Sequence, residues 1–221
     1  MKTRVGLAAI AALVCASVAN ADVVTATYGW EDGGTTFGSN VDNLEMFNNS
    51  DLTYVQSGSR SLGLTEDPTS GTPRAWICYI TGLTDGDIID ADFWAWDNTE
   101  GSSPSLRIWG NYAVGGDLEN DAGSAGGSST YSGGTDEDPW SNLSHQWTFD
   151  SNGGARDTLV IQVRFYASSS SGPDVNTLFV DDLTVAVDAA GDAVIHTPVP
   201  APGALALLGV AGLAGRRRRR N

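Results

Sequence analysis

The sequence predicts an all-β protein, a two-sheet antiparallel β-sandwich. Short segments rich in β-branched and aromatic residues recur along the chain, separated by clusters of Gly, Asp, Ser and Pro. No segment between the two ends of the chain shows a sustained helical period. About eight short strands separated by turns favour two packed sheets. The expected strands cover residues 52–56, 74–80, 88–96, 105–114, 145–149, 158–167 and 177–187.

Alternation within these segments indicates which side chains face the core. In 158–167 an apolar set shares one face of the strand and a polar set shares the other, the pattern of a half-buried strand. The first set is Leu159, Ile161, Val163 and Phe165, and the second is Gln162, Arg164 and Tyr166. The stretch 115–138 breaks the regularity, since nearly all its residues are small or acidic. We expect it to be a long loop.

The N-terminal 21 residues have the composition of a secretory signal peptide. Lys2 and Arg4 precede an apolar run, and small residues end at Ala21, the expected cleavage position. We expect a helix here that directs the chain out of the cell. Export would leave Cys78 as the single cysteine of the mature chain, so no disulfide can form within it.

Residues 22–188 are expected to form one acidic domain with its own core. Residues 22–197 contain all 27 acidic residues of the chain, five arginines and no lysine, which gives this range a net charge of −22. Such a surface repels phosphate backbones and anionic lipid head groups, so we expect no nucleic-acid partner. Cations are the natural counter-ions, and solubility in a salty habitat explains the same composition.

The C-terminal segment combines prolines, an apolar run and a cationic end. Residues 189–202 form the expected linker and sorting motif, with Pro200 and Pro202, and residues 203–221 an apolar helix ending in five arginines, among them Arg216 and Arg217. This plan resembles the PEP-CTERM sorting signal of exported bacterial proteins. The resemblance implies a transient membrane anchor, a processing protease as partner, and a final place at the cell surface or in the extracellular matrix.

Two features of the tail leave an alternative open. Ala201 stands where that family usually carries glutamate. The apolar run is also shorter than the roughly 20 residues that span a bilayer, and such runs are more often buried or interfacial helices.

Three short motifs resemble the jelly-roll carbohydrate-binding modules of the galactose-binding-like superfamily. They are Gly29-Trp30-Glu31, Ser57-Gly58-Ser59-Arg60-Ser61-Leu62, and a closing strand that carries Asp181 and Asp182. The resemblance implies a jelly roll with a structural Ca²⁺ held by Glu31 with Asp181 or Asp182. Ca²⁺ takes six to eight hard oxygen ligands, which carboxylates supply. The alternative is that both aspartates are exposed at a sheet edge.

Tryptophans on polar strand faces suggest carbohydrate binding. Trp94 and Trp96 alternate with core-like residues in 88–96, and Arg107 and Trp109 alternate with Leu106 and Ile108 in 105–114. Flat rings beside charged groups suit the apolar faces and hydroxyl edges of sugars, so Trp94, Trp96, Arg107 and Trp109 are the predicted ligand-binding residues. The alternative is that these tryptophans fill the core.

The sequence does not predict an enzyme. It contains no nucleophile elbow, phosphate loop or zinc-spaced Cys/His cluster, and its domain has one central histidine, His145. The predicted function is non-catalytic: an exported, surface-sorted β-sandwich that binds or builds extracellular polysaccharide. The alternatives are a structural surface protein without a defined ligand and a glycan-active enzyme, since two carboxylates suffice for glycoside hydrolysis.

Overall fold

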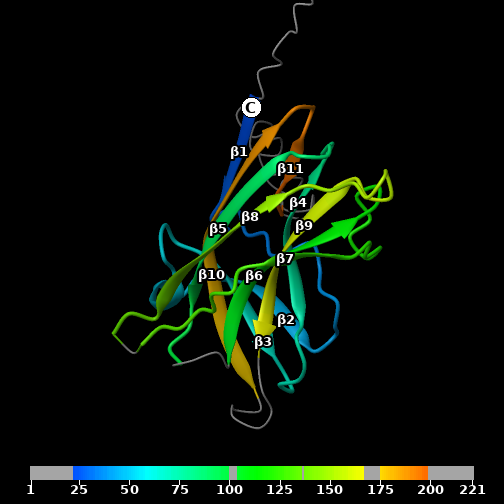
Figure 1. Ribbon diagram of the computed structural model, residues 1–221. Helices are drawn as coiled ribbons and strands as arrows, with labels where there is room; N and C mark the ends of the chain where they lie inside the picture. The colour runs from blue at the N-terminus through cyan, green and yellow to red at the C-terminus, as the bar shows by residue number, and fades with distance from the viewer. Residues whose placement is uncertain (1–21, 100–103, 136, 167–174, 199–221) are drawn as a thin grey trace, which may run out of the picture.

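The computed structural model describes residues 22–99, 104–135, 137–166 and 175–198. These residues form two antiparallel sheets and a single 3-10 turn, which confirms the predicted all-β sandwich (Figure 1).

The helices expected in residues 1–21 and 203–221 lie outside the described part of the chain. None of the described residues forms a helix long and apolar enough to cross a membrane.

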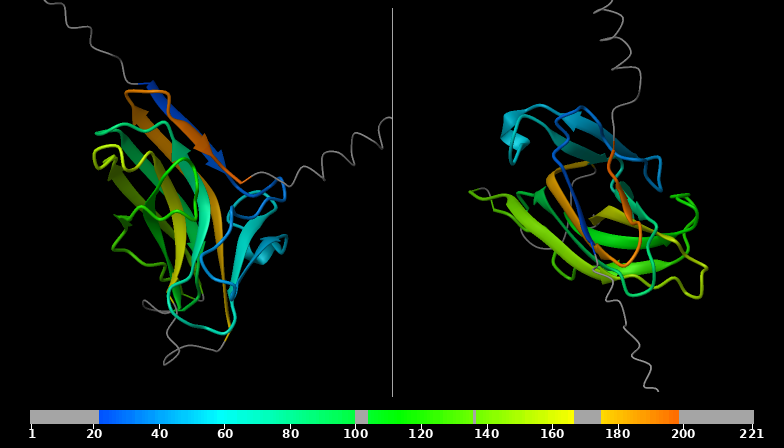
Figure 2. Two further views of the ribbon diagram at one scale, coloured as in Figure 1. Left: turned by 90° about the vertical axis from the view of Figure 1, so that its right-hand side faces the viewer. Right: turned by 90° about the horizontal axis from the view of Figure 1, so that it is seen from above.

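The larger sheet, sheet A, has the strand order β2-β3-β10-β5-β8, and β1 also pairs with β10. Its strands are β1 (Asp22–Tyr28), β2 (Leu44–Asn49), β3 (Ser61–Glu66), β5 (Ile88–Trp96), β8 (Trp140–Thr148) and β10 (Asn176–Ala189). In the left view of Figure 2 the blue and cyan segment that includes β2 and β3 lies on the side away from the green and yellow strands.

The second sheet, sheet B, has the strand order β11-β4-β9-β6-β7. Its strands are β4 (Arg74–Thr81), β6 (Ser105–Ala113), β7 (Ser124–Gly127), β9 (Thr158–Tyr166) and β11 (Val194–His196). The two edge strands, β7 and β11, are the shortest strands of the described chain.

The core lies between the two sheets and contains the residues that alternation in the sequence predicted to face inward. Sheet A contributes the inward residues of β5, and sheet B those of β9, all of them buried. These residues are Ile89, Ala91, Phe93, Ala95, Leu159, Ile161, Val163 and Phe165. Full burial of each large apolar side chain contributes about 1.5–3 kcal/mol. Their polar neighbours therefore face outward on both sheets, which is where a site must lie.

Trp147 joins the two sheets at the β8 edge. Its indole N–H donates to the Gly126 carbonyl of β7 at 2.9 Å, and the ring itself is 3% exposed. Gly110 of β6 provides the space for the ring, since a Cβ at that position would lie 2.7 Å from Trp147 Nε1. The contact fixes how β8 lies against β6 and β7.

Two elements lie where the sequence predicts none. The expected loop 115–138 contains β7, which pairs with β6. The expected linker 189–202 contains the last residue of β10 and the whole of β11, which pairs with β4. The sandwich therefore extends to Pro198, the last described residue.

The segment 52–56 is not the expected strand. Leu52–Tyr54 forms a 3-10 turn, and the Asp51 carboxylate caps it by accepting a hydrogen bond from Thr53 N at 3.0 Å. The Tyr54 ring stacks on Phe179 of β10 at 4.3 Å between centroids, so this segment covers the outer face of sheet A. Strands β1, β2 and β3 were also not among the predicted strands.

Candidate functional site

The outer face of sheet B carries a row of three arginines. The strand register pairs Arg74 of β4 with Arg164 of β9, and pairs Arg164 in turn with Arg107 of β6. Side chains paired in this way have Cβ atoms about 4.5–5.5 Å apart. Three positive side chains thus lie next to one another in a domain whose net charge is strongly negative.

A second row lies two residues along the same strands. Here Trp76 of β4 pairs with Gln162 of β9, and Gln162 pairs with Trp109 of β6. Residues two apart in a strand are about 6.8 Å apart. We call the two rows together the arginine–tryptophan face, which consists of Arg74, Arg107, Arg164, Trp76, Trp109 and Gln162.

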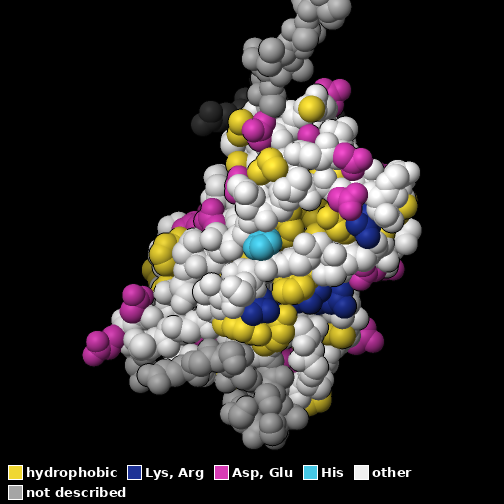
Figure 3. Space-filling model, in the orientation of Figure 1, with side chains coloured by type: hydrophobic (Ala, Val, Ile, Leu, Met, Phe, Trp, Pro, Cys, Tyr) yellow, Lys and Arg dark blue, Asp and Glu magenta, His cyan; other side chains and the backbone are white. Residues whose placement is uncertain are grey.

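Aromatic rings hold two of the three guanidinium groups in place. The guanidinium carbon of Arg164 lies 4.1 Å from the centroid of the Trp109 ring, and that of Arg107 lies 3.9 Å from the Tyr131 ring. Cation–π contacts of this kind contribute about 0.5–1 kcal/mol at exposed sites. Arg107 also donates from Nη2 to the Ser129 carbonyl at 3.0 Å. In Figure 3 dark blue side chains lie among yellow ones near the middle of the molecule, with the magenta acids mostly around its rim.

Polar contacts through Asp121 and Asn111 join Arg74 to Arg164. Arg74 Nη1 lies 3.3 Å from Asp121 Oδ2, the same oxygen accepts from Asn111 Nδ2 at 2.8 Å, and Asn111 Oδ1 accepts from Arg164 Nη2 at 3.3 Å. Within the described residues, Asp121 is the one carboxylate in an ion pair with this row. Burial lowers the pKa of Arg164, and the positive charge of Arg74 acts in the same direction.

Three polar atoms of the face have no hydrogen-bond partner among the described residues. They are Gln162 Oε1, Arg107 Nε and Arg164 Nε, and all three are buried. Gln162 as a whole is only 2% exposed. A buried polar atom left without a partner costs about 1–3 kcal/mol. These partnerless atoms are therefore an energetic cost of holding the arginine row in place.

A hollow of ≈ 130 Å³ opens between the two rows and the loops above them. Arg74, Trp76, Asn111, Asp121 and Gln162 are among its lining residues. A water molecule takes about 30 Å³ in the liquid, so the hollow has room for a polar substituent such as a carboxylate or hydroxymethyl group.

Trp109 is held rigidly by the short strand β7. Its indole N–H donates to Ser124 Oγ at 2.8 Å, and β7 lies so close that a Cβ at Gly127 would be 2.7 Å from Trp109 Cε3. The Ser-Ala-Gly-Gly sequence of β7 is therefore what allows the ring to lie flat against the strand. Strand β7 on one side and the Arg164 guanidinium, 4.1 Å from the ring centroid, together fix the position of the ring.

Trp76 forms the floor of the hollow and is 8% exposed. Phe37 N donates to the Trp76 carbonyl at 2.9 Å, and Trp76 N donates to the Gly38 carbonyl at 3.0 Å. Gly38 has a φ of 134°, and a Cβ there would lie 3.1 Å from the indole ring. The loop before β2 thus folds over Trp76 and leaves Trp109 as the more open ring.

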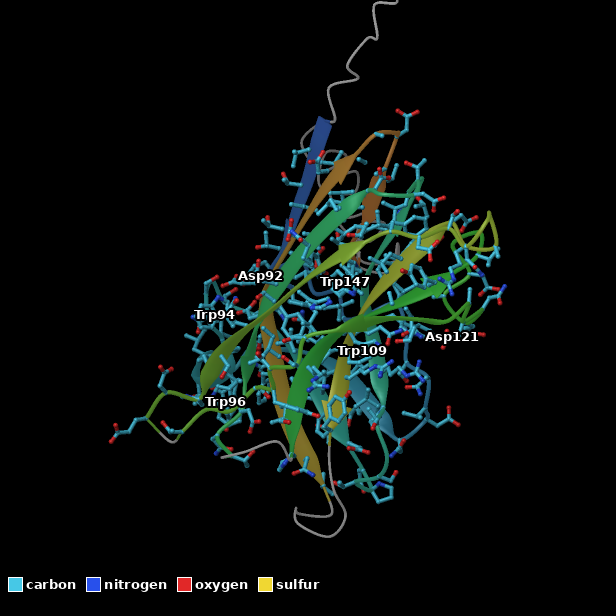
Figure 4. All side chains as sticks on the ribbon, viewed as in Figure 1. Asp92, Trp94, Trp96, Trp109, Asp121 and Trp147 are labelled. Atoms are coloured by element: carbon cyan, nitrogen blue, oxygen red, sulfur yellow. The ribbon has the colours of Figure 1, made fainter. Side chains whose placement is uncertain are left out.

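The structure separates the four predicted ligand-binding residues into two pairs. Arg107 and Trp109 belong to the arginine–tryptophan face, whereas Trp94 and Trp96 lie on the outer face of sheet A (Figure 4). The Trp96 ring packs edge-on against Tyr54, at 4.8 Å between centroids. All four side chains are half-buried. The tryptophans are therefore neither in the main core nor gathered on one surface.

The three predicted metal ligands lie around one segment, residues 56–60. Glu31 accepts hydrogen bonds from Ser59 N at 2.8 Å, Ser59 Oγ at 2.6 Å and Arg60 N at 3.0 Å. These bonds, first those from Ser59, lower the pKa of the Glu31 carboxyl. Asp182 accepts from Ser57 Oγ at 2.7 Å.

Asp181 is fully buried beneath the same segment. Its Oδ2 accepts from Gln56 N at 2.9 Å and Ser57 N at 3.3 Å, and its Oδ1 from Asp182 N at 2.8 Å. Burial raises the pKa of Asp181 to about 6. The two aspartates thus do not both lie exposed at an edge: a bulge in β10, with Asp182 at a φ of 51°, turns them toward the segment together.

The three carboxylates supply the oxygen ligands that Ca²⁺ takes. Their oxygens, however, already accept hydrogen bonds from N–H and O–H groups, and those N–H and O–H groups cannot bind a cation. Within the described residues no group of three or more His, Cys, Asp or Glu is arranged around a point that suits a metal ion. Calcium at Glu31, Asp181 and Asp182 stays a prediction.

Two further groups noted in the sequence lie in apolar surroundings. Cys78 is fully buried, and burial raises the pKa of its thiol. The His145 ring lies edge-on to Trp147 at 4.8 Å between centroids, and partial burial lowers its pKa. Neither lies on the arginine–tryptophan face.

The comparisons with known proteins concern the fold. Neither a protein-family model nor a curated protein sequence matches this chain. Among solved structures, it is similar to the CBM22-1 xylan-binding domain of Xyn10C from Paenibacillus barcinonensis, with 12% identity and a TM-score of 0.50 over 78% of this chain and 99% of that one. The fold is a jelly-roll β-sandwich like that of this domain. The tandem CBM22-1-CBM22-2 structure of the same Xyn10C gives 11% identity and a TM-score of 0.51, over 80% of this chain and 49% of that one.

At this identity the likeness shows the jelly roll alone, and the site must be argued from its own residues. Sequence reasoning placed Gln162 and Arg164 on the polar face of a strand but missed them as site residues, together with Arg74 and Trp76. The signal available was that three of the five arginines between the two ends fall in expected strands beside an aromatic residue: Arg74 near Trp76, Arg107 near Trp109, and Arg164 near Tyr166.

Proposed function

We propose that this chain is a non-catalytic glycan-binding jelly roll, and that the arginine–tryptophan face is its binding surface. The observation that carries the proposal is the row of three arginines beside Trp109, together with the hollow of ≈ 130 Å³ that Arg74, Trp76 and Asn111 line. Sugar hydroxyls both donate and accept hydrogen bonds, and sugars also present apolar surface to aromatic side chains, so a surface of this composition suits a glycan.

The jelly roll supports this proposal because the similar domain of Xyn10C is described as xylan-binding. Binding sites of this kind combine aromatic rings with a small number of placed polar groups. Catalysis is not part of the proposal.

The test is a pull-down and titration against a panel of polysaccharides, with two tryptophan variants. Trp109→Ala should weaken glycan binding about 10-fold or more, since a central aromatic contact contributes about 1.4 kcal/mol or more. Trp94→Ala is the matched control, an equally half-buried tryptophan on sheet A. If Trp94→Ala removes binding and Trp109→Ala does not, the surface lies on the other sheet.

We also propose that residues 1–21 export the chain and that residues 199–221 hold it at the membrane until a protease removes them. The composition of both ends supports this. The intact mass of the secreted protein tests it. A mass that includes residues 203–221 would contradict processing.

A purely structural surface protein is the second candidate. The observation in its favour is the aromatic cover of sheet A, where Tyr54, Trp96 and Phe179 pack against one another. Absence of binding to every polysaccharide of the panel would favour this candidate.

A further inference from the structure

We infer that the glycan bound by this chain is acidic, and that the row Arg74–Arg164–Arg107 binds its carboxylate or sulfate groups. The inference rests on the proposed glycan binding and adds the chemical class of the ligand. Four observations lead to it.

The first is where the few positive charges lie. Between the two ends of the chain there are five arginines, no lysine and 27 acidic residues. Three of the five arginines stand in one row on one face. The other two have separate surroundings: Arg60 donates to Asn48, and Arg156 lies 3.8 Å from Asp150. Like charges side by side repel each other, so a row of this kind needs an anion to offset it.

The second is that the protein itself offsets only part of this charge. Asp121 pairs with Arg74, and no other carboxylate of the described residues forms an ion pair with the row. Glu119 lines the same hollow without such a pair. Arg164 reaches the neutral Asn111, and Arg107 reaches a backbone carbonyl. Two guanidinium charges are therefore left for a ligand.

The third observation is how the Arg107 and Arg164 guanidinium groups are held. Arg107 and Arg164 each lie over an aromatic ring, and in both the Nε atom has no partner. Because Nε is buried, the Nη atoms are the donors that can reach an anion, and guanidinium Nη groups bind the oxygens of a carboxylate or sulfate. Stacking fixes the plane of the group, so less side-chain freedom is lost when an anion binds.

The fourth is the spacing of the two rows. Trp109 and Gln162 lie about 6.8 Å from the arginine row along the strands. A sugar that lies along the second row can therefore extend a charged substituent over Arg164 or Arg107. The ligand carries sparse charge, because a densely charged polymer such as DNA, with one charge per about 1.7 Å, is repelled by the −22 of the domain.

The experiment compares charged polysaccharides with their uncharged counterparts, using the unaltered secreted protein. The probes are polygalacturonate and the same polymer after reduction of its carboxyl groups, and a sulfated galactan before and after desulfation. We expect at least one charged probe to bind 10-fold or more tightly than its uncharged counterpart. The pair that shows the difference tells carboxylate from sulfate.

A variant pair assigns the effect to the row. Arg107→Gln should weaken binding of the charged probe about 10-fold and leave the uncharged probe unchanged, whereas Arg156→Gln, off the row, should change neither. Thermal scans of both variants check that they fold, and the comparison of probes needs no variant at all.

Each outcome decides one point. Equal binding of charged and uncharged probes overturns the acidic ligand and leaves glycan binding in place. Binding to none of the four probes, nor to neutral xylan or mannan, overturns the proposed function as well. Equal losses in the Arg107 and Arg156 variants would show that the row has no special part in binding.

Discussion

The guanidinium of Arg164 on β9 lies 4.1 Å from the ring of Trp109 on β6. This contact joins the arginine row to the tryptophan row, so the charge of one and the flat ring of the other form a single surface. The same ring is bound from behind by β7 through Ser124. What holds β7 in place therefore also determines the geometry of the site.

Gly127→Ala should disturb this surface. A Cβ at Gly127 would meet the Ile108 carbonyl and lie 2.7 Å from Trp109 Cε3, so β7 must move away. We expect the free energy of unfolding to fall by about 1–3 kcal/mol and glycan binding to weaken. Urea unfolding measures the first effect. Gly191→Ala, whose Cβ would meet its nearest atom at 3.7 Å, should change stability by less than about 0.5 kcal/mol.

Trp147→Phe should loosen the contact between the sheets. The substitution keeps an aromatic ring but removes the hydrogen bond to the Gly126 carbonyl. Loss of that bond should lower the free energy of unfolding by about 0.5–1.5 kcal/mol. Trp140→Phe is the control, a tryptophan on the same strand whose indole N–H makes no hydrogen bond to the described residues. Equal losses in the two variants would contradict a role for this bond.

Glu66→Gln should stabilise the protein at neutral pH. Glu66 is fully buried, its Oε2 has no partner among the described residues, and burial raises the pKa of its carboxyl. The folded state therefore binds this proton more tightly than the unfolded state does, and stability falls as pH rises above about 4.5, the ordinary value. Denaturation at a series of pH values should show this fall in the native chain and a weaker one in Glu66→Gln. A variant that is less stable than the native chain at pH 7 would contradict the expectation.

Calcium should raise the melting temperature above its value in EDTA if the predicted site exists. A cation would offset the charges of Glu31, Asp181 and Asp182, of which Asp181 is fully buried. Binding to the folded state alone stabilises it by mass action. The shift should disappear in Glu31→Gln and persist in Glu45→Gln, a change at an exposed acid of β2. Equal melting temperatures with and without calcium would exclude the site.

The periodicity of single strands predicted much of this structure. Alternation correctly placed the inward and outward residues of β5, β6 and β9, because a strand buries one face whatever its neighbours are. It could not predict the row Arg74–Arg164–Arg107, since that row depends on how β4, β9 and β6 pair. Register between strands distant in the sequence is determined by the packing of the whole sheet.

The same limit explains why four predicted ligand residues separate into two pairs. Trp94 and Trp109 both point outward, as alternation indicates, but from different sheets.

Strand β7 was not predicted for another reason. Its Ser-Ala-Gly-Gly sequence has no side-chain pattern, and it becomes a strand because its glycines allow close approach to β6. The residues around Tyr54 have the composition of a strand. Tyr54 nevertheless lies in a capped turn, because the Asp51 carboxylate accepts a hydrogen bond from the Thr53 N–H.

The short edge strands of sheet B have a consequence for crowded surroundings. An exposed edge offers unpaired backbone groups to any neighbouring molecule, and long flat edges promote stacking of chains into fibrils. Strand β11 has three residues and β7 has four, two of them glycine. Many copies held side by side would thus find too few backbone groups on this sheet to join into a continuous intermolecular sheet. This protection belongs to sheet B, since the edge strands of sheet A, β2 and β8, are longer.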